Sequence, residues 1–298
     1  MAENWHGIFP ALPTQFHEDL SIDFDGTMKH LVTLLDAGIH GIVMMGTIGE
    51  NCSLSAEEKR ELLRNTVATA AGRAPVLTGV AECTTAGACR YAADAAEIGA
   101  DGLMVLPAMV YKADSREAAA HFKSVASAST LPILCYNNPA AYGVDMTPET
   151  FTELRDVETI VAIKEASEDI RRITDLFNAH GDRFTLFAGV DDVALEGIML
   201  GCTGFVSGVA NAFPVENVRM WDLAVKGDWE GAREIYRWMM PLSHMDTHPK
   251  LVQFMKLMCQ ECGLGHERTR PPRLALTGDE REWALGEIHK AIDTRPQP

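Results

Sequence analysis

The stretch Ile160-Val161-Ala162-Ile163-Lys164-Glu165-Ala166-Ser167 places a lysine directly after four apolar residues. Such a short apolar run is typical of a strand buried in a parallel sheet. Because an ammonium group is costly to bury, a lysine at this strand end has one of two explanations. Its stem packs while its charge reaches water, or partial desolvation lowers its pKa so that the neutral amine can attack a carbonyl or imine carbon.

Apolar runs of this kind alternate with amphipathic stretches along the chain. The predicted strands are 7–16, 41–45, 76–80, 102–106, 132–136, 160–164, 184–188 and 204–207. The predicted helices are 24–37, 55–71, 85–98, 116–128, 148–155, 170–179, 193–200 and 216–225. Eight strand–helix units at a period of roughly 25–30 residues predict a (β/α)8 TIM barrel. A doubly wound sheet is disfavoured, because no GxGxxG follows an early strand.

The last part of the chain predicts three additional helices, at 229–240, 250–262 and 280–292. Their many large apolar residues must pack on the barrel or on another subunit. We therefore expect residues 1–227 to form the barrel and residues 228–298 to form a C-terminal helical extension packed on it.

The composition excludes several classes of protein. With 26 basic and 42 acidic residues, the net charge of −16 opposes binding to nucleic acid or to an anionic membrane. No apolar run approaches the ~18–20 residues of a membrane span, and the first residues do not form a signal peptide. Seven scattered cysteines predict free thiols, so we expect a cytoplasmic protein. A single CxxC, Cys259 and Cys262, predicts no metal site.

The carboxyl ends of barrel strands carry the chemistry of such folds. Here these ends place Lys164, Tyr136 and Thr47 around one cavity. The lysine can serve as the nucleophile, the tyrosine as the proton shuttle, and the threonine as a relay that orients the tyrosine. Each has an ordinary structural reading alone, as a strand-end lysine, a rim tyrosine or a turn residue. Their combination at the rim favours catalysis.

Three motifs resemble the dihydrodipicolinate synthase/N-acetylneuraminate lyase family of class I Schiff-base lyases. They are Gly46-Thr47-x-Gly49-Glu50, Tyr136-Asn137-x-Pro139 and Ile163-Lys164-Glu165, and the resemblance covers almost the whole chain. It implies that Lys164 forms the imine, Tyr136 is the acid/base, and the Thr47 loop binds the carboxylate of a 2-oxo acid. It also implies a homotetramer that needs no metal or redox cofactor.

Departures from the family pattern narrow the expected substrate. Ile48 stands where the family has a second Thr or Ser, and no arginine follows Pro139, where Ala140 and Ala141 stand instead. The double tyrosine expected after Pro107 is also missing, and we expect Tyr111 to compensate for it. The full set of expected substrate contacts is Ile48, Gly49, Asn51, Tyr111, Asn138, Gly189, Val206 and Ser207.

Whole-chain likeness is greatest to the 1-pyrroline-4-hydroxy-2-carboxylate deaminases of hydroxyproline breakdown, which implies a cyclic imine substrate and 2,5-dioxopentanoate and ammonia as products. The alternatives are a 2-keto-3-deoxy sugar acid dehydratase or aldolase, a 4-hydroxy-tetrahydrodipicolinate synthase, and an inactive barrel that only binds a 2-oxo acid. A metal-dependent aldolase would need His or Glu clusters at the strand ends, and the sequence places none there.

Overall fold

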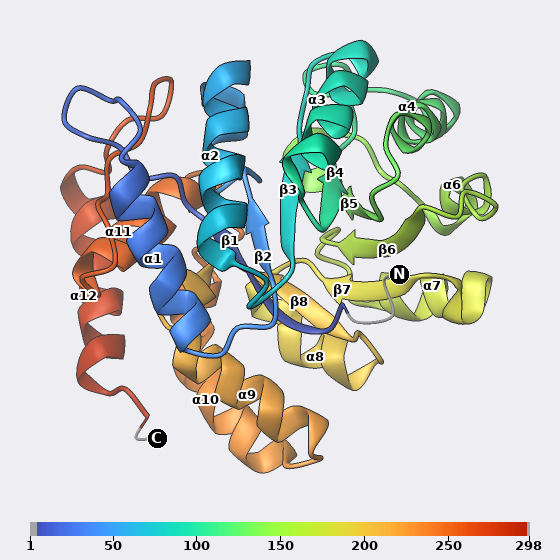
Figure 1. The fold of residues 1–298 in the computed structure, drawn as a ribbon. Helices are drawn as coiled ribbons and strands as arrows, with labels where there is room; N and C mark the ends of the chain where they lie inside the picture. The colour runs from blue at the N-terminus through green and yellow to red at the C-terminus, as the bar shows by residue number, and fades with distance from the viewer. Residues whose placement is uncertain (1–4, 297–298) are drawn as a thin grey trace.

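The eight predicted strands form a closed parallel barrel in chain order, in a computed structural model that describes residues 5–296. Figure 1 shows the barrel with its helices on the outside. The TIM-barrel prediction is thereby confirmed. The strands are β1 Gly7–Leu12, β2 Ile42–Met44, β3 Val76–Val80, β4 Gly102–Val105, β5 Ile133–Asn137, β6 Ile160–Glu165, β7 Thr185–Ala188 and β8 Gly204–Ser207.

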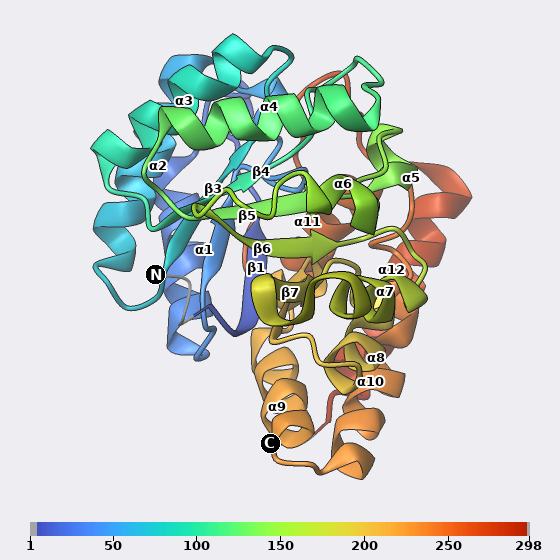
Figure 2. The same cartoon turned by 90° about the vertical axis from the view of Figure 1, so that its right-hand side faces the viewer.

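Helices connect and cover the strands, as Figure 2 shows for the side of β5, β6 and β7. They are α1 Phe24–Asp36, α2 Ala56–Ala70, α3 Thr85–Ile98, α4 Ser115–Ala128, α5 Pro139–Tyr142, α6 Pro148–Thr152, α7 Arg171–His180, α8 Ala194–Met199, α9 Pro214–Val225, α10 Trp229–Ser243, α11 Leu251–Glu261 and α12 Gly278–Asp293. Short 3₁₀ turns are η1 Asn51–Ser53, η2 Gly181–Arg183, η3 Asp191–Val193 and η4 Val209–Asn211. None of the described helices is long and apolar enough to cross a membrane.

The predicted boundaries differ from the structure at two places near the barrel mouth. The first strand ends at Leu12, and Phe16 instead makes an isolated antiparallel bridge with Ile22. The short helix α5 was not predicted; Asn138 caps it by accepting a hydrogen bond from the amide of Ala141, and Pro139 occupies its first turn. One turn of helix is too short to show a periodic pattern in the sequence.

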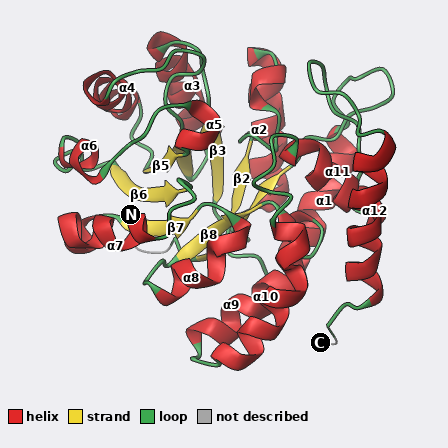
Figure 3. Cartoon of the chain, turned by 180° about the vertical axis from the view of Figure 1, so that it is seen from behind, coloured by secondary structure: helices red, strands yellow, loops and turns green. Residues whose placement is uncertain are grey.

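The three C-terminal helices pack on the barrel and on each other (Figure 3). Helix α10 packs on α9, and α12 packs on both α10 and α11. Trp238 of α10 contacts the ring of Phe213 edge-on at 5.2 Å and donates a hydrogen bond from its Nε1 to the carbonyl of Ala291 at 3.2 Å. The apolar residues of the extension are thus largely buried within this chain.

A buried ion pair joins this extension to the loop after β2. Lys256 of α11 donates to Glu50 Oε1 at 2.9 Å and to the carbonyl of Thr14 at 2.8 Å, and both side chains are inaccessible to solvent. The other carboxylate oxygen, Oε2, accepts from the amide of Arg270 at 2.9 Å. Glu50, the last residue of the loop motif, therefore connects the loop to the C-terminal helices.

We expect Glu50→Gln to destabilise the protein strongly. The substitution leaves the Lys256 ammonium buried without its counter-charge, which costs about 3–5 kcal/mol of unfolding free energy. Urea unfolding measures the loss, and Asp36→Asn is the matched control, because its ion pair with Arg73 is exposed and contributes about 0–1 kcal/mol. The double variant Glu50→Gln/Lys256→Met should recover part of the loss. If Glu50→Gln and the control Asp36→Asn lowered the free energy of unfolding equally, this account would be contradicted.

Candidate active site

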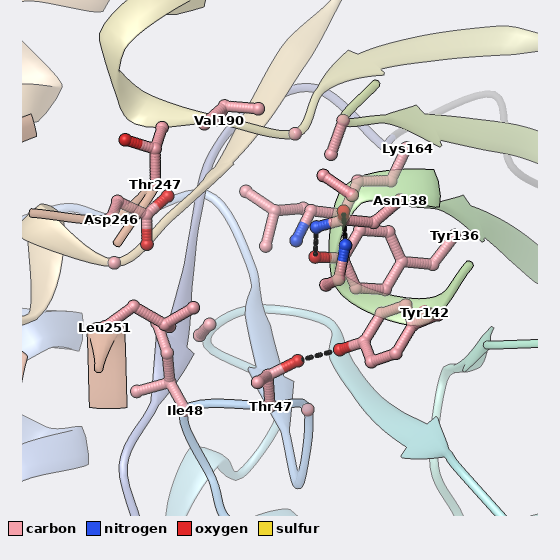
Figure 4. A pocket seen from close by; sticks show the side chains of 18 of the residues that line it. Thr47, Ile48, Tyr136, Asn138, Tyr142, Lys164, Val190, Asp246, Thr247 and Leu251 are labelled. Carbon is pink, nitrogen blue, oxygen red and sulfur yellow. Dashed lines mark hydrogen bonds between the residues drawn. The ribbon is translucent and has the colours of Figure 1, made fainter. Parts of the chain in front are cut away.

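A cavity of about 500 Å³ opens at the carboxyl ends of the strands, the end at which barrel folds carry their chemistry. Its walls come from the loop after β2, from the end of β5 with helix α5, from β6, from the ends of β7 and β8, and from residues 246–251 between α10 and α11. Figure 4 shows these walls from close by. The C-terminal extension thus contributes one side of the cavity.

Lys164 and Tyr136 lie at the same level of neighbouring strands. Their Cα atoms are register partners in the β5–β6 pair, so both side chains point into the barrel mouth. Lys164 Nζ lies 3.8 Å from the centroid of the Tyr136 ring. Burial lowers the pKa of Lys164 to about 8, against the opposing influence of Asp246 and Asp191. A sizeable fraction of neutral amine is therefore present near neutral pH, as a nucleophilic lysine requires.

The hydroxyl of Tyr136 belongs to a chain of polar groups on one side of the cavity. It accepts a hydrogen bond from Asn138 Nδ2 at 3.1 Å, and its ring meets that of Tyr142 edge-on at 5.7 Å. The hydroxyl of Tyr142 is in turn hydrogen-bonded to Thr47 Oγ1. Burial raises the pKa of both tyrosines, so each stays protonated at rest and can donate a proton. The chain provides a route by which a proton can move.

The loop after β2 has the geometry of a carboxylate site. Met45 and Glu50 bracket it with positive φ angles of 52° and 55°, a conformation that non-glycine residues adopt only when the surroundings hold them. Gly49 allows the tight turn, because a Cβ there would lie 2.7 Å from the Met45 backbone. Among the described residues, the amides of Thr47 and Ile48 have no hydrogen-bond acceptor. Free amides in a turn favour anion binding.

Two further motif residues, Asn137 and Glu165, connect the ends of β5 and β6. Asn137 donates to Glu165 Oε2 at 3.0 Å, and Glu165 Oε1 accepts from the amide of Ser167 at 2.7 Å. Asn137 Oδ1 accepts from the amide of Met146 at 2.8 Å. These bonds fix the ends of β5 and β6 relative to each other, and thereby the positions of Tyr136 and Lys164.

The structure brings most of the predicted site residues to the cavity wall. They are Lys164, Tyr136, Thr47, Ile48, Asn138, Gly189 and Val206. Which of them contact a substrate stays a prediction, because their placement shows only that they can reach one.

Four predicted contacts lie elsewhere. Tyr111 is 59% exposed and hydrogen-bonded to Glu117 at 3.1 Å, so it does not compensate for the missing tyrosine within this chain. Gly49 lies behind the loop, where its carbonyl accepts from Thr14. The buried side-chain amide of Asn51 donates to the carbonyl of Gly79, and the hydroxyl of Ser207 donates to Asp191 at 2.5 Å. The bonds of Gly49, Asn51 and Ser207 connect the strand ends to their neighbours, and a substrate contact at any of the four positions stays a prediction.

Two polar residues of the cavity wall were not among the expected substrate contacts, although Tyr142 was considered as an alternative proton carrier. Tyr142 lies next to Tyr136, edge-on to its ring; its place in the run Tyr136 to Tyr142 was visible in the sequence, but the turn of α5 that brings it back was not. Asp246 comes from the segment between α10 and α11, which showed no motif. Across residues 5–296, no three His, Cys, Asp or Glu side chains gather in a way that could hold a metal ion.

Comparisons with known proteins agree with this geometry. Residues 4–292 match the dihydrodipicolinate synthetase family. The chain is 32% identical to the 4-hydroxy-tetrahydrodipicolinate synthase of Methanothrix thermoacetophila over 288 residues, 95% of this chain and 96% of that one. It is also 32% identical to the synthase of the same name from Archaeoglobus fulgidus over 292 residues, 97% and 99% of the two chains.

Solved structures show the same similarity in three dimensions. A dihydrodipicolinate synthase from Aquifex aeolicus superposes with a TM-score of 0.92 at 29% identity, covering 97% of this chain and 98% of that one. A second crystal structure of a dihydrodipicolinate synthase gives a TM-score of 0.90 at 30% identity, with 97% and 99% covered. The chain therefore belongs to the dihydrodipicolinate synthetase family and is a class I lyase, an enzyme that works through a lysine Schiff base.

Proposed function

We propose that this enzyme is a deaminase that converts 1-pyrroline-4-hydroxy-2-carboxylate to 2,5-dioxopentanoate and ammonia. One observation carries the choice of substrate class: Lys164 is the only lysine or arginine among the described residues that line the cavity. Ala140 and Ala141 occupy the wall where the family's synthases have an arginine. The free amides of Thr47 and Ile48 can hold one carboxylate, and the described residues of the cavity wall include no lysine or arginine besides Lys164 to hold another.

The reaction uses the groups on the cavity wall. Lys164 adds to C2 of the cyclic imine and displaces the ring nitrogen, which leaves a linear Schiff base with a free amine at C5. Tyr136, in the chain with Tyr142 and Thr47, gives its proton to the departing ring nitrogen. The resulting tyrosinate takes up a proton from C3, and the enamine so formed expels the C4 hydroxyl. Tautomerisation then moves the double bond to an imine at C5, and hydrolysis releases ammonia and the lysine. The lysine imine is the electron sink for these steps.

A second candidate, synthesis of 4-hydroxy-tetrahydrodipicolinate, is supported by the names of the relatives. That reaction joins pyruvate to an aldehyde that carries its own carboxylate, for which this cavity lacks the arginine. A 2-keto-3-deoxy sugar acid dehydratase or aldolase would use the same lysine and tyrosine. An inactive barrel that binds a 2-oxo acid would use neither.

A substrate panel separates these functions. We expect ammonia and 2,5-dioxopentanoate from the pyrroline. Turnover should be far weaker with a 3-deoxy-2-oxo pentonate, and with pyruvate plus aspartate semialdehyde. If either alternative were turned over faster than the pyrroline, the corresponding function would replace the proposed one. A protein that gives no product from any of them, and no reducible imine with pyruvate, would be a binding barrel.

We also propose that the enzyme is a cytoplasmic homotetramer. Apolar side chains remain exposed on the outside of this chain, among them Val110 at 93% and Leu274 at 74%. Contact with another subunit would cover such groups. Sedimentation at micromolar concentration should give a species several times heavier than the 32.6 kDa chain. A single species with the mass of one chain would contradict the proposal.

A further inference from the structure

Asp246 is a carboxyl group on the cavity wall for which the reaction above has no role. It follows α10 in a segment held by Met245, which is completely buried. Its Oδ2 accepts a long hydrogen bond, 3.5 Å, from the amide of Asp191, and that is the one hydrogen bond to its side chain within residues 5–296. Gly208 makes room for it, since a Cβ there would lie 2.7 Å from Asp246 Oδ1. The carboxyl group is thus positioned but keeps free bonding capacity toward the cavity.

The carboxyl group and the tyrosine hydroxyls belong to different sides of the cavity. Figure 4 shows Asp246 and Thr247 on one side, and Tyr136, Asn138 and Tyr142 on the other. The first side lies over the ends of β7 and β8, and the second over the end of β5. A substrate joined to Lys164 therefore has the hydroxyl chain on one flank and a carboxyl group on the other.

We propose that Asp246 is the general acid that protonates the C4 hydroxyl of the substrate as it leaves. This inference rests on the proposed function, because it assigns the proton that the departing oxygen needs. Hydroxide is a poor leaving group, and a positioned acid contributes about 10²–10⁴-fold to such a step. The hydroxyl chain takes up the C3 proton on the opposite flank, so neither group has to perform both tasks at once.

The surroundings of Asp246 favour its protonated form. Ile48, whose Cδ1 lies 3.0 Å from the position of a Cβ on Gly208, and Leu251 are apolar neighbours on the same wall. The charged groups that face Asp246 are Asp191 and Asp192 of η3 and Lys164 of β6. Burial and then Asp191 raise the pKa of Asp246, against the opposing influence of Lys164. The hydroxyl of Tyr136 is neutral, because burial raises its pKa as well.

The other polar groups of the wall are less suited to this task. Glu168 and Thr247 line the cavity at exposed positions, where water competes for their hydrogen bonds. His248 Nδ1 already accepts from the amide of Lys250 at 3.1 Å. On the opposite flank, Tyr142 and Thr47 are hydrogen-bonded to each other, and the hydroxyl of Tyr136 accepts from Asn138.

The proton balance closes with Asp246 in this role. Tyr136 first gives its proton to the ring nitrogen that Lys164 displaces, and the resulting tyrosinate takes the C3 proton. Loss of that proton forms the C2=C3 bond of an enamine, and the imine electron pair goes to the lysine nitrogen. That pair then re-forms the C2=N bond, C3=C4 forms, and the C4–O bond breaks. The oxygen leaves as water with the proton of Asp246. The resulting carboxylate takes the proton that tautomerisation removes from C5, which restores the acid, while Tyr136 returns its proton to C3 and water supplies the proton at C4. Hydrolysis of the two iminium groups then releases two protons, which restore Tyr136 and neutralise the hydroxide left from that water.

The test compares two leaving groups in Asp246→Asn. With the hydroxylated pyrroline, kcat should fall about 10²–10⁴-fold, because the amide has no acidic proton to give. With the 4-fluoro analogue, whose fluoride departs without a proton, kcat should fall less than about 10-fold. Exchange of the methyl hydrogens of pyruvate in D₂O, which needs only the imine and the C3 proton transfer, should also stay within about 10-fold of the wild type.

Asp192→Asn is the matched control, because it removes a neighbouring charge that pairs with His244 outside the cavity; it should leave all three rates near the wild type. If Asp246→Asn lowers the hydroxyl and fluoro reactions equally, or slows pyruvate exchange to the same extent, the residue has a structural role and the inference fails. It fails too if neither reaction changes.

The proposed function is judged separately, on the wild type. Elimination from a 3-deoxy-2-oxo pentonate but not from the pyrroline would refute the deaminase, and Asp246→Asn would then be judged on the pentonate. No C4 elimination from either substrate would refute both.

Discussion

Lys164→Ala should abolish turnover and, with it, every trace of a reducible imine. We assign its amine as the nucleophile, and no other lysine or arginine of the described chain lines the cavity. Borohydride reduction in the presence of pyruvate should add mass to the wild type at Lys164 alone, as peptide mass spectrometry can show. Because the side chain ends in the cavity and not in the apolar core, Lys164→Met should keep the wild-type melting temperature while losing the same activity.

Lys112 is the appropriate control for this experiment. It is an exposed lysine whose Cε would lie 2.8 Å from a Cβ on Gly143, one residue after the end of α5. Lys112→Ala should therefore keep full imine formation. An adduct on Lys112 in the wild type, or residual turnover in Lys164→Ala, would contradict the assignment of the nucleophile.

The pH dependence of imine formation follows from the environment of Lys164. Its pKa is lowered to about 8, and the neutral amine is the reactive form. The initial rate of imine formation with pyruvate should thus rise with pH up to about 8 and level off above it. An unperturbed lysine would continue to gain rate up to about pH 10.4. The rate of borohydride-trapped adduct formation between pH 6 and 10 distinguishes the two.

The barrel could be predicted from the sequence because its signal is periodic. Eight apolar runs separated by helical stretches leave few other architectures, and the runs at 160–164 and 204–207 match β6 and β8 to within one residue. The position of Lys164 relative to Tyr136 followed from the same regularity, since neighbouring parallel strands end at the same edge of the sheet. Local pattern and global fold agree here, which is what a foldable sequence requires.

The cavity wall was less predictable because loops decide it. Tyr111 and Tyr142 both follow strands, and the sequence offers no measure of which one turns inward; the cap made by Asn138 and the single turn of α5 settle it. Asp246 is about 80 residues beyond β6, in a segment whose place depends on how α10 packs on α9. Motif membership also does not separate roles, because Glu50 and Lys164 belong to comparable motifs, yet one is a buried anchor and the other faces the cavity.

Tyr136→Phe should lower kcat about 10²–10⁴-fold, with a smaller change in KM. The substitution keeps the ring against which Lys164 Nζ lies at 3.8 Å, and it keeps the edge contact with Tyr142. It removes only the hydroxyl, which accepts from Asn138 and to which we assign the proton exchange with the substrate. Imine trapping on Lys164 should become slower and yet still occur, because the amine remains. Steady-state kinetics and trapping rates on the same preparations separate the two effects.

Substitutions next to Tyr136 should cause smaller losses in kcat. Thr47→Val and Tyr142→Phe each remove one partner of the Thr47–Tyr142 hydrogen bond, so both should show a weaker form of the same loss in kcat. The two changes should not add in the double variant, because either one alone interrupts the chain. If Tyr136→Phe kept a near wild-type kcat while Tyr142→Phe did not, the proton would pass through Tyr142 directly. The acid/base role would then belong to Tyr142, and Tyr136 would serve to hold the lysine.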